Sequence, residues 1–240
     1  MFTDGNAVGL LRNGVEYFPA IIAAMEHARA SIYLETYIFA DDVSGRAVAT
    51  ALTRAAARGL DVRVVVDGFG TKPYFSESLA SALVDGGVRL VRYREDVVAM
   101  NWNRGRLRRL HRKLVIVDGA IAFVGGINII DDHNTPGQTP PRIDFAVCVK
   151  GPLLEPIIAA ANRLWLVLRV MTISDASLPA LNLSAVTESC GQVKAKFVLR
   201  DNLGFRRQIE NAYLAALRID RKSTRLNSSH RNTSRMPSSA

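Results

Sequence analysis

Segments with helical and strand-like patterns alternate along the first 170 residues, and this alternation constrains the fold more than any other feature. Short apolar runs rich in β-branched residues predict strands, and apolar residues at helical spacing predict helices between them. Strands separated by helices favour an α/β sandwich around a mixed β-sheet. The expected strands are 31–39, 61–67, 88–94, 113–117, 120–124 and 145–149, and the expected helices are 18–29, 44–58, 76–85 and 153–168.

Local signals mark several of these boundaries. Ser44 can cap the second helix and Gly59 can end it. Asp118-Gly119 lies between two β-rich runs and is typical of a hairpin turn. Residues 95–110, between two expected strands, carry several arginines and predict a basic loop.

Composition excludes several classes of protein. With 240 residues, of which 48% are hydrophobic, the chain is long enough to bury a core. No run approaches the roughly 18 uncharged apolar residues of a membrane span, and no signal peptide is evident at the N-terminus. Two cysteines do not make a disulfide framework. The net charge of +9 favours anionic partners such as nucleic acid, phospholipid or phosphorylated substrates.

The C-terminal part differs from the rest. After an expected loop at 174–192, a strand at 193–200 and a helix at 205–218 follow, and this helix resembles the opening helix in pattern. We expect a first domain at 1–172 and a linker with the start of a second repeat at 173–219. Residues 220–240 have six serines, five basic residues and one acid, which predicts disorder. Their back-translation resembles a sequencing adapter, so we expect an artefact tail, the alternative being an ordinary disordered tail.

The segment from Leu110 to Asn128 carries the chemistry. His111 and Lys113 are two residues apart, so on a strand both side chains point to the same face. Lysine can hold the anionic oxygens of a phosphate, and a neutral imidazole can attack its phosphorus. We expect the hairpin turn to fold the Asp118 carboxylate back toward Lys113. The pair Gly125-Gly126 would let a ligand approach the backbone, and Asn128 would add an amide donor.

Each of these features alone is weak, but His-x-Lys-x4-Asp-x6-Gly-Gly-x-Asn at fixed offsets is specific. The segment resembles the HKD signature of the phospholipase D superfamily. The resemblance extends over about residues 8–218, through NGVEYFPAIIAAMEHARASIYLETYIFADDVSG, VVVDGFGT and DFAVCVKGP, and is greatest to bacterial cardiolipin synthases of the B type. It implies a phospholipase D-like αβα sandwich, with one complete half and the start of a second.

The resemblance also implies a metal-free and cofactor-free exchange of phosphodiesters. Two motifs meet at one site, where one histidine forms a phosphohistidine and the other protonates the leaving alcohol. By resemblance, His111 is the motif histidine, Lys113 the phosphate-binding lysine and Asn128 the amide donor. Asp118 is the motif aspartate, and Asp144 matches the acidic residue that hydrogen-bonds the histidine. Gly125, Gly126, Arg109 and Arg112 are further candidates for substrate binding.

Only one such motif occurs in the chain. We therefore expect a missing C-terminal half or a second chain to complete the site, and little activity from this chain alone. The first hypothesis is a cardiolipin synthase-type phosphatidyltransferase that joins two phosphatidylglycerols and releases glycerol, bound peripherally to the cytoplasmic side of a bacterial membrane. The alternatives are a phosphodiesterase acting on nucleic acid and a non-catalytic phosphate-binding fragment. No Walker loop, Gly-x-Ser-x-Gly elbow or Gly-x-Gly-x-x-Gly loop is present.

Overall fold

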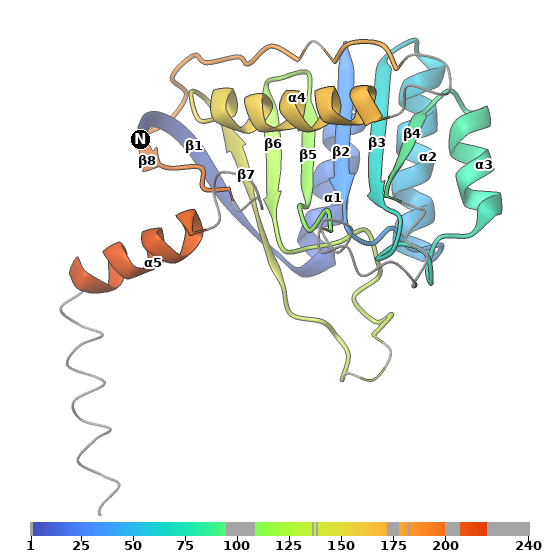
Figure 1. The fold of residues 1–240 in the computed structure, drawn as a ribbon, viewed down its shortest axis with the longest axis horizontal. Helices are drawn as coiled ribbons and strands as arrows, with labels where there is room; N and C mark the ends of the chain where they lie inside the picture. The colour runs from blue at the N-terminus through green and yellow to red at the C-terminus, as the bar shows by residue number, and fades with distance from the viewer. Residues whose placement is uncertain are drawn as a thin grey trace, which may run out of the picture. The chain divides into compact units, whose positions relative to one another are not determined.

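A computed structural model describes residues 2–94, 109–135, 137, 139–171, 178–181, 183–199 and 207–219. Its centre is an eight-stranded mixed sheet in the order β4-β3-β2-β5-β6-β7-β1-β8 (Figure 1). The expected α/β sandwich around a mixed sheet is confirmed. The strands are β1 (Thr3–Arg12), β2 (Ser31–Thr36), β3 (Asp61–Asp67), β4 (Arg89–Tyr93), β5 (Leu114–Val117), β6 (Ile121–Gly125), β7 (Phe145–Lys150) and β8 (Val193–Ala195).

The sheet is parallel on one side of β2 and antiparallel on the other. Strands β2, β3 and β4 are parallel to one another, because helices α2 (Val43–Ala57) and α3 (Glu77–Asp85) connect them. From β5 onward, neighbouring strands are antiparallel. Since β5 runs against β2, with Glu35 paired to Leu114, the residues just before β5 lie beside the carboxyl end of β2.

Helices cover both faces of the sheet (Figure 1). On one face, α1 (Asn13–Glu26), α2 and α3 form the main core with alternate strand residues, among them Ile32, Leu34 and Phe123. On the other face, α4 (Leu154–Met171) crosses the strands, and its Trp165 packs edge-on against Tyr33 with ring centroids 6.1 Å apart. In the described part of the chain, no helix is both long and apolar enough to cross a bilayer.

Three local expectations were incomplete. Strand β1 was not predicted, because its Gly and Asn residues interrupt the apolar alternation. The cap of α2 is Asp42, whose carboxylate accepts a hydrogen bond from the Gly45 N–H, whereas the Ser44 hydroxyl donates to Asp131. The strand expected at 193–200 is shorter in the structure, where β8 covers Val193–Ala195.

The chain divides into two compact units, Met1–Lys196 and Phe197–Ala240. The second contains α5 (Gln208–Ile219), which confirms the helix expected near the C-terminus. The tail at 220–240 and most of the basic loop at 95–110 lie outside the described residues. The domain limits at 172 and 219 stay predictions.

Candidate functional site

The site lies where the parallel strands end and the polypeptide enters β5. His111 and Lys113 directly precede β5, and Asn128 follows the end of β6. The antiparallel pairing of β5 with both neighbours brings these segments together at one edge of the sheet. In open α/β sheets the crevice outside the carboxyl ends of strands is the usual place for a ligand.

A pocket of about 460 Å³ opens at this edge. It contains four of the five predicted catalytic side chains, those of His111, Lys113, Asn128 and Asp144, together with the backbone of Gly126. Residues from three further segments complete its wall: Ile38, Tyr74, Thr135 and Arg142. The sequence motif and the pocket therefore coincide.

His111 is held in its neutral form. Burial lowers the pKa of its imidazole, the nearby Lys113 ammonium lowers it further, and Asp67 opposes both. The ring lies against Tyr37, with centroids 5.0 Å apart and planes tilted by 51°. An imidazole that is neutral at pH 7 keeps a lone pair available for attack on an electrophile.

Lys113 supplies the positive charge beside this imidazole. Its side chain is only 6% exposed, and burial lowers the pKa of the ammonium to about 8, against the attraction of Asp144 and Asp67. At pH 7 the group is therefore still mostly charged. Its Nζ lies 5.3 Å from the centre of the Tyr37 ring, so this aromatic side chain contacts both the cation and His111.

Asn128 has its amide oriented by the backbone. Its Oδ1 accepts a hydrogen bond from the Ile38 N–H at 3.0 Å. Because the oxygen is engaged, the NH₂ group is the part of the side chain left to bind a ligand in the pocket. A neutral base, a cation and an amide donor thus converge, which is the set needed to bind a phosphate and attack it.

Comparisons with known proteins agree with this geometry. The family model described as "Cardiolipin synthase, PLD-like domain" matches residues 21–135, a range that contains His111, Lys113, Asp118 and Asn128. This chain contains a phospholipase D-like domain. The solved phospholipase D family member Nuc from Salmonella typhimurium has the same fold, with a TM-score of 0.50 and 20% identity, over 67% of this chain and 94% of that one.

Two curated relatives extend the match beyond the phospholipase D-like domain. Cardiolipin synthase B of Salmonella typhimurium is 34% identical over 224 residues, which are 89% of this chain and 51% of that protein. Cardiolipin synthase A of Pseudomonas putida is 38% identical over 152 residues, 62% of this chain and 31% of that protein. The chain spans about half the length of the B-type relatives that it matches.

The expectation that the Asp118 carboxylate folds back toward Lys113 was wrong. Its carboxylate does not fold back toward Lys113 but accepts hydrogen bonds from the backbone N–H groups of residues 29, 30 and 31, at 2.8 to 2.9 Å. It lies at the hairpin turn, and the strand β5 separates it from Lys113. Asp118 therefore fastens the hairpin to the start of β2, and it has no contact with the pocket.

Packing requires both glycines. A side chain at Gly125 would collide with the β7 backbone at Phe145 and Ala146. One at Gly126 would collide with the carboxylate of Asp144, which occupies the space above the glycine. Gly126 lines the pocket, whereas Gly125 is not among the residues of its wall.

Asp144 lies in the pocket but serves a different neighbour than expected. Its carboxylate raises the pKa of Lys113, and no hydrogen bond joins it to His111 among the residues that the structure describes. Its backbone N–H donates to Asn13 Oδ1 at 3.0 Å, which fixes the start of β7. The Asp144 carboxylate therefore acts electrostatically on the Lys113 ammonium and makes no hydrogen bond to the imidazole in the described part of the chain.

Neither expected arginine lines the pocket. The Arg112 side chain lies on the opposite face of the sheet, where its Nε is 2.7 Å from Oε2 of the buried Glu35. The Arg109 guanidinium stacks on the Phe69 ring, with Cζ 4.2 Å from the ring centre. The alternation of side chains along a strand explains why Arg112 is not in the pocket. It lies between His111 and Lys113, so its side chain must point to the opposite face of the sheet.

The sequence reasoning missed two residues that shape the site. Asp67 ends β3, is fully buried and accepts hydrogen bonds from the N–H groups of Phe69, Gly70 and Leu110. Tyr37 follows β2 and packs on His111. An acid directly after a buried parallel strand was the signal available for Asp67, but nothing in the pattern distinguished Tyr37 from a core aromatic residue.

Proposed function

We propose that this chain supplies one half of a phosphatidyltransferase of the cardiolipin synthase type. The observation that carries the proposal is the convergence of a neutral imidazole at His111, a buried ammonium at Lys113 and an oriented amide at Asn128 in one pocket. The relatives named cardiolipin synthase B, 34% identical over 224 residues, support phosphatidylglycerol as the substrate.

The reaction follows from these groups. A histidine attacks the phosphorus of one phosphatidylglycerol, a P–N bond forms, and the P–O bond to the glycerol headgroup breaks. The leaving glycerol oxygen takes a proton from a second histidine. A hydroxyl of another phosphatidylglycerol then attacks phosphorus, gives its proton to that second histidine and returns the electron pair to the first. Lys113 and the Asn128 amide bind the phosphoryl oxygens throughout.

The second histidine must come from another motif, since the chain has one His-x-Lys-x4-Asp sequence. We propose that a second phospholipase D-like unit, in the same protein or in another copy, supplies it. Residues 1–172 would form the first unit and residues 173–219 would begin the next, while residues 220–240 take no part. Binding to anionic lipid at the cytoplasmic surface of a bacterial membrane is part of the same proposal.

A substrate with a good leaving group tests the proposal on this chain alone. p-Nitrophenolate leaves without protonation, so the p-nitrophenyl ester of a short-chain phosphatidic acid bypasses the need for a second histidine. We expect a burst of about one p-nitrophenolate per chain, with the phosphoryl group attached to His111. The burst should vanish in His111→Asn and persist in His27→Asn, a histidine that lies outside the pocket.

Other outcomes would contradict the proposal. A burst that survives in His111→Asn would place the chemistry elsewhere, and no burst at all would favour a non-catalytic phosphate-binding fragment. A burst with thymidine 5′-(p-nitrophenyl phosphate) but not with the lipid ester would favour a nuclease. With phosphatidylglycerol itself, we expect a turnover at least about 10²-fold below that of a two-motif relative, because general acid catalysis is missing.

A further inference from the structure

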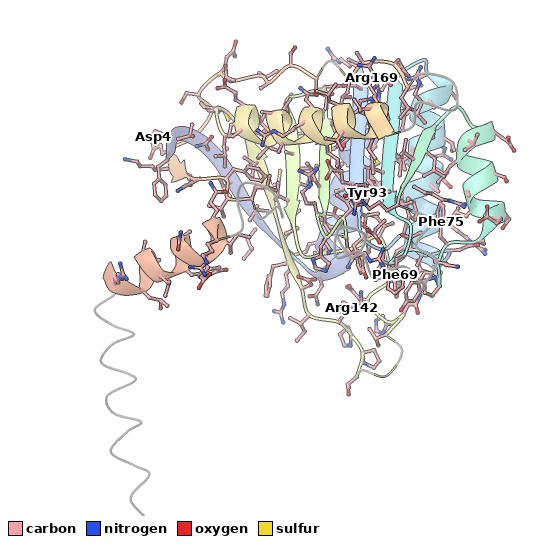
Figure 2. All side chains as sticks on the ribbon, viewed as in Figure 1. Asp4, Phe69, Phe75, Tyr93, Arg142 and Arg169 are labelled. Atoms are coloured by element: carbon pink, nitrogen blue, oxygen red, sulfur yellow. The ribbon has the colours of Figure 1, made fainter. Side chains whose placement is uncertain are left out.

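Arg142 lines the pocket from a segment that no motif includes. It lies on the long connection between β6 and β7, below the edge of the sheet where Phe69 also lies (Figure 2). Two hydrogen bonds hold it there: its backbone N–H donates to the Asp132 carbonyl at 2.9 Å, and its Nη2 donates to the Asn134 carbonyl at 3.2 Å. The side chain is half-buried, and it forms part of the same pocket wall as Tyr74.

The charge of this guanidinium is not matched within the described part of the chain. Arg142 makes no ion pair there, and only one of its five N–H donors has a partner, the neutral carbonyl of Asn134. Asp144 is only two residues away, but its carboxylate lies over Gly126 and acts on Lys113. The pocket thus holds a second cation besides Lys113, free to bind an anion.

The proposed reaction requires a second anion at this place. The donor lipid presents one phosphodiester to His111 and Lys113. The acceptor lipid attacks with a glycerol hydroxyl, and its own phosphodiester is attached to the other end of that glycerol. When the hydroxyl is at the phosphorus, the acceptor phosphate is therefore one glycerol length away, still inside or at the rim of the pocket. A planar guanidinium is well suited to bind it, because it offers paired donors to phosphate oxygens.

We propose that Arg142 binds the phosphate of the acceptor alcohol and so selects a phosphorylated acceptor over glycerol or water. This inference rests on the proposed phosphatidyltransferase function, and it assigns the acceptor side of the site, which the His-x-Lys motif does not address. Lys113 and Arg142 then bind different phosphates of the same reaction.

Partitioning of the phosphohistidine tests the assignment. After a burst with the p-nitrophenyl ester, glycerophosphoglycerol, glycerol and water compete as acceptors for the phosphohistidine intermediate, and the rate of transfer to each is measured. The acceptor oxygen forms a P–O bond, the P–N bond breaks, and the hydroxyl proton passes to water. We expect Arg142→Gln to lower the rate with glycerophosphoglycerol about tenfold, the usual effect of losing a hydrogen bond to a charged group, without changing burst amplitude or reaction with glycerol. Arg142→Lys should restore part of the preference.

The matched control is Arg54→Gln, an arginine on α2 that lies outside the pocket. If the burst is present and Arg142→Gln keeps the full preference for glycerophosphoglycerol, the inference is wrong while the proposed function stands. If Arg54→Gln loses the preference equally, general surface charge explains it and the inference is also wrong.

A binding measurement decides the inference even when no burst occurs. The Nε–H resonance of Arg142 in the full chain should shift saturably with glycerophosphoglycerol and not with glycerol. The shift should persist in Lys113→Met, because the two cations bind separate phosphates. No shift, a shift shared by the Nε–H of Arg54, or loss of the shift in Lys113→Met would each overturn the assignment.

Discussion

The ion pair behind the motif is the most informative place to perturb this fold. Glu35 is completely buried on the α4 face of the sheet, where its Oε1 accepts hydrogen bonds from the Tyr33 hydroxyl at 2.8 Å and from Arg112 Nη2 at 3.0 Å. Arg112 lies between His111 and Lys113 in sequence, so the pair fixes the strand that carries both. Arg112→Met removes the cation and leaves a buried carboxylate, for which Tyr33 is then the one hydrogen-bond donor among the described residues.

The expected cost follows from burial. Breaking a fully buried ion pair from one side costs about 3–5 kcal/mol, because an unpaired charge stays in the interior. The Arg112 side chain is 20% exposed and Tyr33 still donates to Glu35, so we expect about 2–4 kcal/mol for Arg112→Met. The double variant Glu35→Gln with Arg112→Met removes both charges and should lose only about 1 kcal/mol.

The loss should also depend on pH. Burial raises the pKa of Glu35, while Arg112 and Tyr33 lower it, so removing Arg112 raises the pKa further. An acid whose pKa is higher in the folded chain than in the unfolded chain binds more protons when the chain is folded. The free energy of unfolding therefore decreases as pH rises toward the pKa of the folded state. The cost of Arg112→Met should therefore be larger at pH 8 than at pH 5, because a lower pH favours the protonated form of Glu35.

Urea unfolding followed by Trp165 fluorescence measures both effects, since this buried indole packs against Tyr33. Two results would refute the reasoning. One is a loss below about 1 kcal/mol at pH 8, and the other is a loss that is the same at pH 5 and pH 8. A double variant that is less stable than Arg112→Met would also contradict it, because the carboxylate would then be stabilising without its partner.

Three further predictions concern the site. Phosphate affinity, measured by titration calorimetry, should fall as pH rises through about 8, the pKa of Lys113, and Lys113→Met should abolish this dependence. Because Lys113→Met also removes a buried charge, urea unfolding should show that the fold is more stable by about 1–3 kcal/mol. Asp118→Ala should lose about 2 kcal/mol of stability through three backbone hydrogen bonds yet keep the phosphate affinity of the parent chain. Gly126→Ala should push the Asp144 carboxylate away and lower the pKa of Lys113 further, measurable by NMR titration of its ammonium; an unchanged pKa would mean that Asp144 does not act on Lys113.

Most of the fold was accessible from the sequence because strong local patterns agree with the tertiary structure. The run DVRVVVD became β3, and Asp118-Gly119 became a hairpin turn in which both residues have positive φ, 53° and 63°. Strand β1 escaped prediction because its stability comes from pairing with β7 and β8, partners more than 130 residues away, and not from its own composition. Pairing between distant segments cannot be detected from a short stretch of sequence.

The site was predictable in part for the same reason. His111 and Lys113 were placed together by the two-residue period of a strand, and the same period, applied to Arg112, would have sent that side chain to the opposite face. The expectation for Asp118 was wrong because closeness in sequence to Lys113 was interpreted as closeness in space. Lys113 precedes β5 and Asp118 follows it, so the two residues lie at opposite ends of the strand. A motif defines which residues occur together in sequence without defining which of them meet in space.

Asp118 shows how a motif can join stability to chemistry. Its carboxylate fixes the start of β2 to the β5–β6 turn, and the register of β2 with β5 then brings the carboxyl end of β2 beside His111 and Lys113. The residues that follow that end, Tyr37 and Ile38, pack on the imidazole and orient the Asn128 amide. Asp118 therefore acts on the pocket only through strand register, and its loss should lower stability before it alters any contact to a phosphate.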